Sequence, residues 1–209
     1  MDVDTQRDFF LADGHACIRN HRRVLSNIRR MMAWARRNHI EVISTCEVHS
    51  NSNGTHNDDD IFCVDGTFGV EKISYTLLPD RACFTADGNS ELPGDVLRRY
   101  KQVILDKRCE NPFEEPRIER LLSEVNAAEF VVIGATAERA VAATVLGLLQ
   151  RNKRVTVVTD AIGAHNTEEA KIAIRKMCAK GAKLIETKKL AGASHLQRVN
   201  ACQCRMCAN

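Results

Sequence analysis

The sequence lacks a long apolar run and a recognisable secretion signal. Its longest uncharged apolar stretch, Ala140 to Leu149, has about half the length that a membrane-spanning helix needs, so we expect no membrane segment. Met1 is followed by Asp2 and Asp4, whereas a secretory signal starts with basic residues and continues with an apolar segment. The sequence therefore predicts a protein that is neither inserted in a membrane nor secreted.

The chain also lacks an excess of charge of one sign. Its 209 residues include 30 Lys and Arg against 27 Asp and Glu, which gives a net charge of +3. This balance does not indicate a nucleic acid or an anionic membrane as partner, so we expect a small molecule instead. With 44% hydrophobic and 27% charged residues, the composition is typical of one globular α/β domain of this length.

Cysteine is abundant, but its pattern does not predict disulfides. The nine cysteines are an odd number, and they are scattered along the chain rather than arranged as a disulfide framework. Reduced thiols are typical of proteins in a reducing compartment. Together with the missing secretion signal, the cysteines predict a cytoplasmic protein.

Short apolar runs alternate with amphipathic segments along most of the chain. Near-continuous apolar strands that alternate with helices indicate βαβ units and a parallel sheet buried on both faces. The sequence therefore predicts a doubly wound, three-layer α/β/α fold, Rossmann-like, with a mainly parallel sheet of about six strands. We expect one domain over residues 1–190 and a Cys-rich tail over 191–209. Strands are expected over 40–45, 102–106, 129–133, 154–159 and 183–186, and helices over 18–38, 116–125, 138–150 and 167–180.

The alternation stops between residues 47 and 100, where Asn, Asp, Gly, Ser and Thr are frequent. A long irregular excursion within a compact domain is usually functional, and open parallel sheets bind ligands at the carboxyl ends of their strands. Asp4 and Lys107 lie at two such strand ends. Because an ammonium group from a neighbouring strand sets the ionisation of a carboxylate, the two residues fit an acid–base pair. By spacing alone they also fit solvated residues at the start of loops.

Four segments carry a resemblance to a known family. They read VDTQRDFF from residue 3, VILDKRCENPF from residue 103, VVIGATAERAVAAT from residue 131 and RVTVVTDAIGAH from residue 154. In order and spacing they resemble the signatures of the isochorismatase-like cysteine hydrolase superfamily, which includes nicotinamidases, N-carbamoylsarcosine amidases and isochorismatases. The resemblance covers residues 3 to about 187. It implies the isochorismatase-like variant of the expected fold and a homo-oligomer, either a dimer or a tetramer.

The resemblance implies a catalytic triad of which one member is missing. Asp4 matches the aspartate and Lys107 the lysine of the amide-hydrolysing members. Their G-x-x-T-D-x-C-V stretch, laid over residues 134–141, puts Ala140 where the nucleophilic cysteine belongs. A methyl group cannot attack a carbonyl, so we do not expect amide hydrolysis through a thioester. Cys46 and Cys109 also follow expected strands, but each would need a differently placed substrate, and inert thiols are the alternative.

Other features of the pocket are implied by the same resemblance. The peptide between Ala135 and Thr136 matches the family's unusual cis bond, which directs the backbone N–H groups of Thr136 and Ala140 at a substrate oxygen. Gln6 and Asp8, which belong to the first motif, are further candidates for substrate binding. Such an anion-binding turn does not need a cysteine.

The resemblance also raises the question of a metal. Nicotinamidases have a D-x-H stretch after the second strand and two further histidines. Here the matching residues are Glu47 and His49, with His56 as a third candidate ligand and Phe62 where the last histidine is expected. Glu and His are suitable ligands for Zn²⁺, and three of them would leave an open position. The alternative is a set of polar loop residues that line a pocket, and no cofactor follows with certainty.

The C-terminal tail contains a second set of metal-ligand residue types. Their spacing differs from the paired C-x-x-C of a zinc ribbon, so a structural zinc ion and a tail of reduced thiols both remain open. The residues of this set are His195, Cys202, Cys204 and Cys207.

Three interpretations of the function follow. The first is a hydrolase that needs no nucleophilic cysteine. Isochorismatase-type members act on a vinyl ether, where an aspartic acid protonates the enol carbon and water adds to the oxocarbenium ion; Asp4 as general acid and Lys107 as its electrostatic partner suffice for that route, with Ala140 in place. The second is a non-catalytic member that binds a small molecule or serves in assembly. The third is a deliberate replacement of an amidohydrolase's cysteine by alanine.

Overall fold

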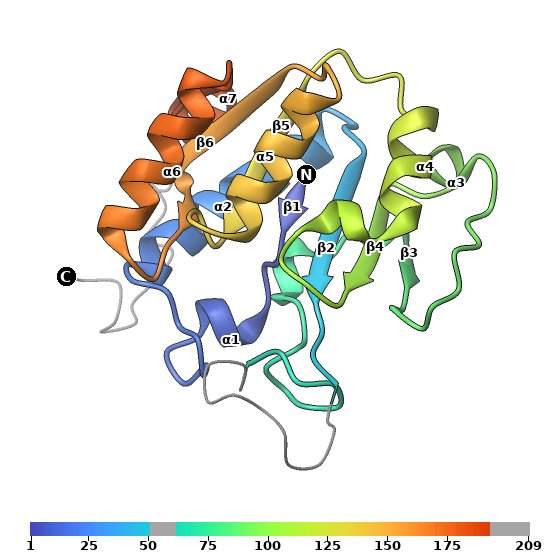
Figure 1. The fold of residues 1–209 in the computed structure, drawn as a ribbon, viewed down its shortest axis with the longest axis horizontal. Coiled ribbons are helices and arrows are strands. Elements are labelled where there is room, and N and C mark those ends of the chain that lie inside the picture. Colours follow the sequence, from blue (N-terminus) through green and yellow to red (C-terminus); the bar gives the residue numbers. More distant parts are fainter. Residues whose placement is uncertain (51–61, 193–209) are drawn as a thin grey trace.

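Parallel strands form one twisted sheet at the centre of the molecule (Figure 1). The computed structural model describes residues 1–50 and 62–192, and within these ranges the sheet has seven strands in the order β3-β4-β2-β1-β5-β6-β7. All neighbouring strands run parallel, which confirms the predicted class, with one strand more than expected. The strands are β1 (Asp2–Val3), β2 (Val42–Glu47), β3 (Arg81–Phe84), β4 (Gln102–Lys107), β5 (Phe130–Ala135), β6 (Val155–Gly163) and β7 (Lys183–Ile185).

Helices cover both faces of the sheet, as three-layer packing requires. In Figure 1, α5 and α6 lie in front of the sheet and α2 lies behind it. The front helices bury their apolar side chains in one core cluster, and α2 packs on the other face in a second cluster. The helices are α1 (Arg7–Phe10), α2 (His21–Arg37), α3 (Val96–Arg99), α4 (Pro116–Glu124), α5 (Ala140–Gln150), α6 (Thr167–Ala179) and α7 (Thr187–Ala191), with 3-10 turns η2 (Ser74–Thr76) and η3 (Pro112–Glu114).

The middle strands are buried along their whole length, which explains their continuous apolar sequences. Every residue of β2 is buried, and most of β4 and β5 are too. The register pairs Thr45 with Val3 on one side and with Leu105 on the other. The same register pairs Glu47 with Lys107 at the ends of β2 and β4. This register places the two charged side chains next to each other at the carboxyl end of the sheet.

Several expected boundaries were wrong for local reasons. The helix expected over 18–38 begins only at His21, because Asn20 has a left-handed backbone and Arg19 pairs with Ala164. The segment between residues 47 and 100, expected to be irregular, contains β3, η2 and α3. The edge strand β3 is short and only half-buried, so it lacks the apolar run that marks the central strands.

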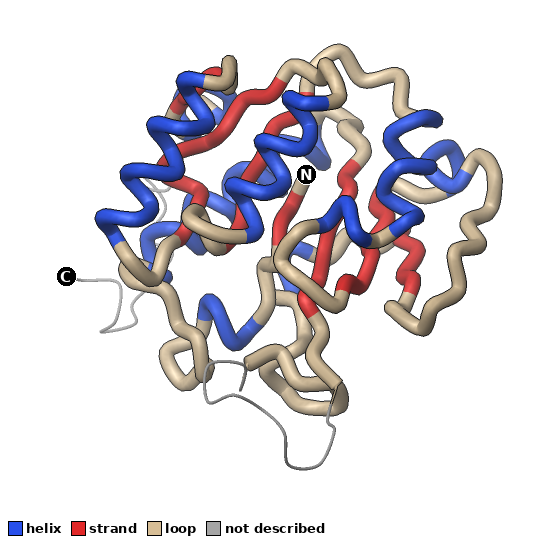
Figure 2. Tube along the Cα trace, in the orientation of Figure 1, coloured by secondary structure: helices blue, strands red, loops and turns tan. Residues whose placement is uncertain are grey.

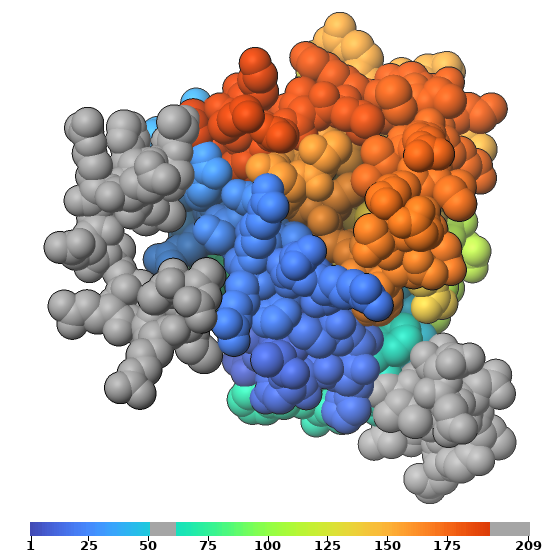
Figure 3. Space-filling model, turned by 90° about the vertical axis from the view of Figure 1, so that its left-hand side faces the viewer, coloured from blue at the N-terminus to red at the C-terminus, as the bar shows by residue number. Residues whose placement is uncertain are grey.

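Loops that follow β1, β2 and β4 gather at the carboxyl end of the sheet, the lower edge in Figure 2. Figure 3 views the molecule from its side and shows the blue N-terminal surface bordering the red surface near residue 190, where α2 and α7 pack together. None of the described helices is long and apolar enough to cross a membrane.

Candidate functional site

A buried aspartate and a buried lysine meet at the carboxyl end of the sheet. Asp4 directly follows β1 with a left-handed backbone (φ 47°), and Lys107 is the last residue of β4. Strand β2 lies between these two strands, so the lysine side chain reaches across its end. The Nζ atom of Lys107 is 2.7 Å from Oδ2 of Asp4, and both side chains are almost completely buried. The structure thus brings together two residues that lie more than a hundred positions apart.

Glu47 adds a second carboxylate to this pair. Its Oε2 is 3.1 Å from Nζ of Lys107, and its Oε1 is 3.0 Å from Nε2 of His49. The lysine also donates a hydrogen bond of 3.0 Å to the carbonyl of Cys109. Two buried carboxylates therefore share one buried ammonium group. The sequence assigned Glu47 to a metal site and did not predict this role.

The two carboxylates differ in proton affinity. Burial has the largest effect on Asp4 and raises its pKa; Lys107 opposes this effect, Glu47 reinforces it, and the pKa ends above its ordinary value. Burial would also raise the pKa of Glu47, but hydrogen bonds from His49 and Lys107 outweigh it and lower the pKa to about 2. Burial would lower the pKa of Lys107, but the two carboxylates raise it. Of the two acids, Asp4 is the one that holds a proton more readily.

A small cavity adjoins this charged group. Its volume is about 10 Å³, which is room for about one water molecule. Oδ2 of Asp4 accepts no hydrogen bond of good geometry from the described residues, although the lysine ammonium is close to it. The cavity is lined by Asp4, Phe9, Glu47, Phe62, Glu110, Thr136, Arg139, Ala140 and His165.

Four of the lining residues were missed by the sequence analysis: Phe9, Glu110, Arg139 and His165. Phe9 stacks against Phe62 with their ring centroids 5.4 Å apart, and Arg139 forms an ion pair with Glu110. They come from separate parts of the chain, Phe9 from α1 and the others from the segments after β4, β5 and β6, so no local pattern in the sequence connects them. Their presence makes the wall of the cavity partly aromatic and partly charged.

The start of α5 forms another wall. The peptide between Ala135 and Thr136 is cis, as the resemblance implied, and Ala140 is the first residue of the helix. The carbonyl of Thr136 accepts the N–H of Val141 at 3.0 Å. In the described part of the chain, the N–H groups of Thr136 and Ala140 have no acceptor. The N-terminus of a helix carries a partial positive charge, so this wall suits a negatively charged oxygen.

Gln6 and Asp8, the further candidates for substrate binding, do not line this small cavity. Gln6 donates to the carbonyls of Glu47 and Val70 and accepts the N–H of Glu47. Asp8 accepts the backbone N–H of Cys63 at 2.6 Å and that of His15 at 3.1 Å. Because their polar atoms are used for these bonds, both residues hold loops in place.

The cysteines near the site are poor nucleophiles. Burial raises the pKa of Cys46 to about 12, and Cys46 lies within β2, packed in an apolar cluster with Val48 and Ile104. Burial, together with the carboxylate of Glu114, raises the pKa of Cys109 to about 11, and its thiol points to that carboxylate. Reactive cysteines have a lowered pKa, so the raised pKa of both thiols disfavours a nucleophilic role.

The described residues do not fit a zinc site. Glu47 and His49 are close to each other, but Lys107 occupies the second oxygen of Glu47. Phe62 is at the position where the last histidine ligand is expected. Its ring packs edge-on against His49, with the ring centroids 4.9 Å apart. No three His, Cys, Asp or Glu residues converge on one point in residues 1–50 and 62–192. His56 and the tail set His195, Cys202, Cys204 and Cys207 lie outside the described residues.

The fold and the site together define a class of protein: a three-layer α/β domain with a buried aspartate–lysine pair at the carboxyl end of a parallel sheet, beside the first turn of a helix. Within this class, the model of the isochorismatase domain matches residues 3–189. The chain therefore belongs to the isochorismatase family, as its motifs predicted. No curated protein matches the sequence closely enough to count as a relative.

Solved structures share this fold. An isochorismatase family protein from Desulfovibrio vulgaris superposes with a TM-score of 0.71 at 21% identity, covering 90% of this chain and 93% of that one. A pyrazinamidase of Pyrococcus horikoshii in complex with zinc gives 0.69 at 19% identity, with coverage of 88% and 96%. A pyrazinamidase/nicotinamidase from Streptococcus mutans gives 0.69 at 18% identity, with coverage of 88% and 97%. At these low identities, the similarity to the three structures shows a shared fold and nothing further.

Proposed function

We propose that this chain is a cysteine-independent hydrolase of a small molecule of the vinyl-ether type, with Asp4 as general acid and Lys107 as its electrostatic partner. The observation that carries the proposal is the buried group in which Asp4 and Glu47 share one ammonium. Because burial, reinforced by the charge of Glu47, raises the pKa of Asp4, this residue is suited to carry and donate a proton.

The reaction needs no covalent bond between the enzyme and the substrate. Asp4 donates its proton to the terminal carbon of the enol ether, and the electron pair of the double bond forms the new C–H bond. Water adds to the resulting oxocarbenium carbon and returns a proton to Asp4. The hemiketal then breaks its C–O bond to give a ketone and an alcohol. Lys107 keeps Asp4 in place and stabilises its carboxylate after the proton has left.

We assign the position of the family's nucleophile to Ala140, and we assign the free N–H groups of Thr136 and Ala140 to a substrate oxygen. Both residues line the same cavity as Asp4. A thiol at position 140 could attack a carbonyl and accept an acyl group. The methyl group of alanine cannot, so the proposed reaction depends on proton donation by Asp4. Because the cavity holds about one water molecule, a substrate has to displace side chains of its wall, of which Arg139 and Glu110 are partly exposed.

The test uses isochorismate and follows the release of pyruvate with lactate dehydrogenase. We expect release by the native chain and a loss of at least about 100-fold in Asp4→Asn, the usual contribution of a general acid. The matched control is Asp106→Asn, which removes a carboxylate beside Lys107 that does not line the cavity. No release above background at high protein concentration, or undiminished release from Asp4→Asn, would refute the proposal.

A second variant separates the alternative interpretations. If the native chain releases no pyruvate but Ala140→Cys hydrolyses nicotinamide in a thiol-dependent way, the site is that of an amidohydrolase whose nucleophile has been replaced. If both proteins are inactive while folded, a non-catalytic binding or assembly role takes the place of the proposed function. Circular dichroism of each variant shows whether it is folded.

A further inference from the structure

A second cavity among the described residues lies at the end of the sheet opposite to the candidate site. Its volume is about 420 Å³, within the range of small-molecule sites. It opens at the amino ends of β1, β2, β5, β6 and β7, whereas Asp4 and Lys107 lie at the carboxyl ends. Along β1, Asp4 lies three residues after Met1 of this cavity, which is roughly 10 Å of extended chain. The proposed hydrolysis leaves this amino-end cavity without a role.

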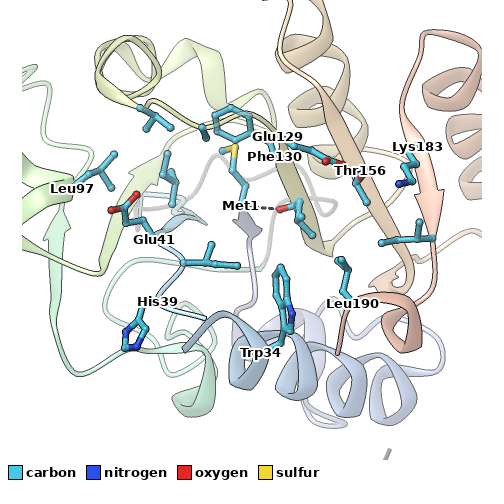
Figure 4. Close-up of a pocket in the computed structure, with 16 residues that line it drawn as sticks. Met1, Trp34, His39, Glu41, Leu97, Glu129, Phe130, Thr156, Lys183 and Leu190 are labelled. Atoms are coloured by element: carbon cyan, nitrogen blue, oxygen red, sulfur yellow. Dashed lines mark hydrogen bonds between the residues drawn. The ribbon is translucent and has the colours of Figure 1, made fainter. Parts of the chain in front are cut away.

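The walls of the amino-end cavity are mostly apolar. Figure 4 shows the indole of Trp34 rising from α2 towards Met1, with Leu190 of α7 at its side. Phe130 and Leu97 close the opposite wall. Trp34 is only half-buried, so its ring still presents a face to a ligand. An apolar body of one or two rings suits such walls.

The polar groups of this cavity favour a positive charge. Glu41 and Glu129 are exposed carboxylates at its rim. Among the described lining residues, Lys183 is the only lysine, and there is no arginine. The Met1 amine donates to the carbonyl of Val131, and burial lowers its pKa to about 6, so it is mainly neutral at pH 7. One hydroxyl donor, Thr156, bonds to Glu129. Two carboxylates against one ammonium leave a net negative charge around an apolar space.

We propose that the amino-end cavity is a second ligand site, which binds a small organic cation with an apolar body, such as an aryl-alkyl amine. The ammonium pairs with one of the two rim carboxylates, Glu41 or Glu129, and the apolar part packs on the ring of Trp34. This assignment does not depend on the reaction at Asp4, because the two cavities have no lining residue in common.

The chain provides its own reporter, because Trp34 is its single tryptophan. Three probes of one shape separate charge from size: 4-phenylbutylamine, 4-phenylbutanol and 4-phenylbutanoate. On titration into the full chain at pH 7, we expect the amine to change the emission of Trp34 saturably, with a dissociation constant at least tenfold lower than that of the alcohol. The butanoate should bind more weakly still. Equal responses to the three probes, or none, would overturn the proposal.

Variants locate the charge that the amine recognises. The double variant Glu41→Gln, Glu129→Gln should bind the amine no better than the alcohol, whereas Glu168→Gln, an exposed carboxylate on α6, should leave the titration unchanged. Asp4→Asn should also leave it unchanged, which distinguishes this site from the candidate active site. A tenfold preference for the amine that persists in the double variant would overturn the assignment.

The same titration tests other occupants of the cavity. If the emission of Trp34 changes on dilution without any probe, and the amine gives no response at any protein concentration, a second copy of the chain covers this face and the ligand proposal fails. Binding measured by calorimetry should fall at least fivefold in Trp34→Leu and less in Trp34→Phe, because phenylalanine keeps an aromatic face. Equal affinities in both variants would contradict the role of the ring.

Discussion

Replacing Glu47 by glutamine should lower the pKa of Asp4. Both carboxylates contact the same ammonium, at 2.7 and 3.1 Å, so their nearest oxygens are at most roughly 6 Å apart. At this separation and an effective dielectric constant of about 20, two unit charges repel by about 3 kcal/mol. Removing that repulsion decreases the proton affinity of Asp4 by up to about 100-fold. Glutamine keeps an oxygen that can still accept from Lys107.

The measurement is a carboxyl-carbon NMR titration, in which Asp4→Asn assigns the resonance of Asp4. In Glu47→Gln its midpoint should move to lower pH than in the native chain. Thr45→Val is the matched variant with the opposite effect, because the Thr45 hydroxyl donates to Asp4 at 2.6 Å and lowers its pKa. A midpoint that stays in place or rises in Glu47→Gln would refute the idea that the two acids compete for one ammonium.

Other variants test stability. Lys107→Met should cost about 3–5 kcal/mol in urea unfolding because it leaves two buried carboxylates unpaired, whereas the exposed Lys101→Met should be almost neutral. Gly69→Ala should cost about 1–3 kcal/mol, since a Cβ there would lie 2.1 Å from the Asp8 carboxylate, and Gly94→Ala, with open space around it, should not. The lowered pKa of Glu47 stabilises the fold above pH 4.5; native stability should lose about 3 kcal/mol as the pH falls to about 2, and Glu47→Gln should lack this loss.

The fold was predictable because its central strands are buried on both faces. Runs such as the apolar part of β5 are visible in the sequence as continuous hydrophobic segments, and amphipathic helices alternate with them. The missed strand β3 lies at the edge of the sheet, where burial is partial and the apolar signal is weak. Helix starts were less predictable, since the first turn of α5 is displaced to Ala140 by the turn that contains the cis peptide.

The candidate site was predictable only in part. Asp4 and Lys107 stand out because both lie at strand ends, where parallel sheets place ligands. The role of Glu47 depends on the register of β2 against β4, which sets its side chain beside Lys107, and register is not visible in one sequence. Gln6 is a substrate-binding candidate because it belongs to the first motif; its bonds to the backbone of Glu47 depend on tertiary contacts that one sequence does not show.

The charge at position 47 links these observations to the chemistry of the site. A carboxylate that activates a thiol must be unprotonated, whereas one that protonates a carbon must first hold a proton. Burial has the largest effect on Asp4 and raises its pKa, whereas the ammonium of Lys107 lowers it. The second carboxylate, Glu47, repels Asp4 and adds to the rise in its pKa that burial causes. Under the proposed function, Glu47 and Ala140 together favour proton donation by Asp4 over the generation of a thiolate.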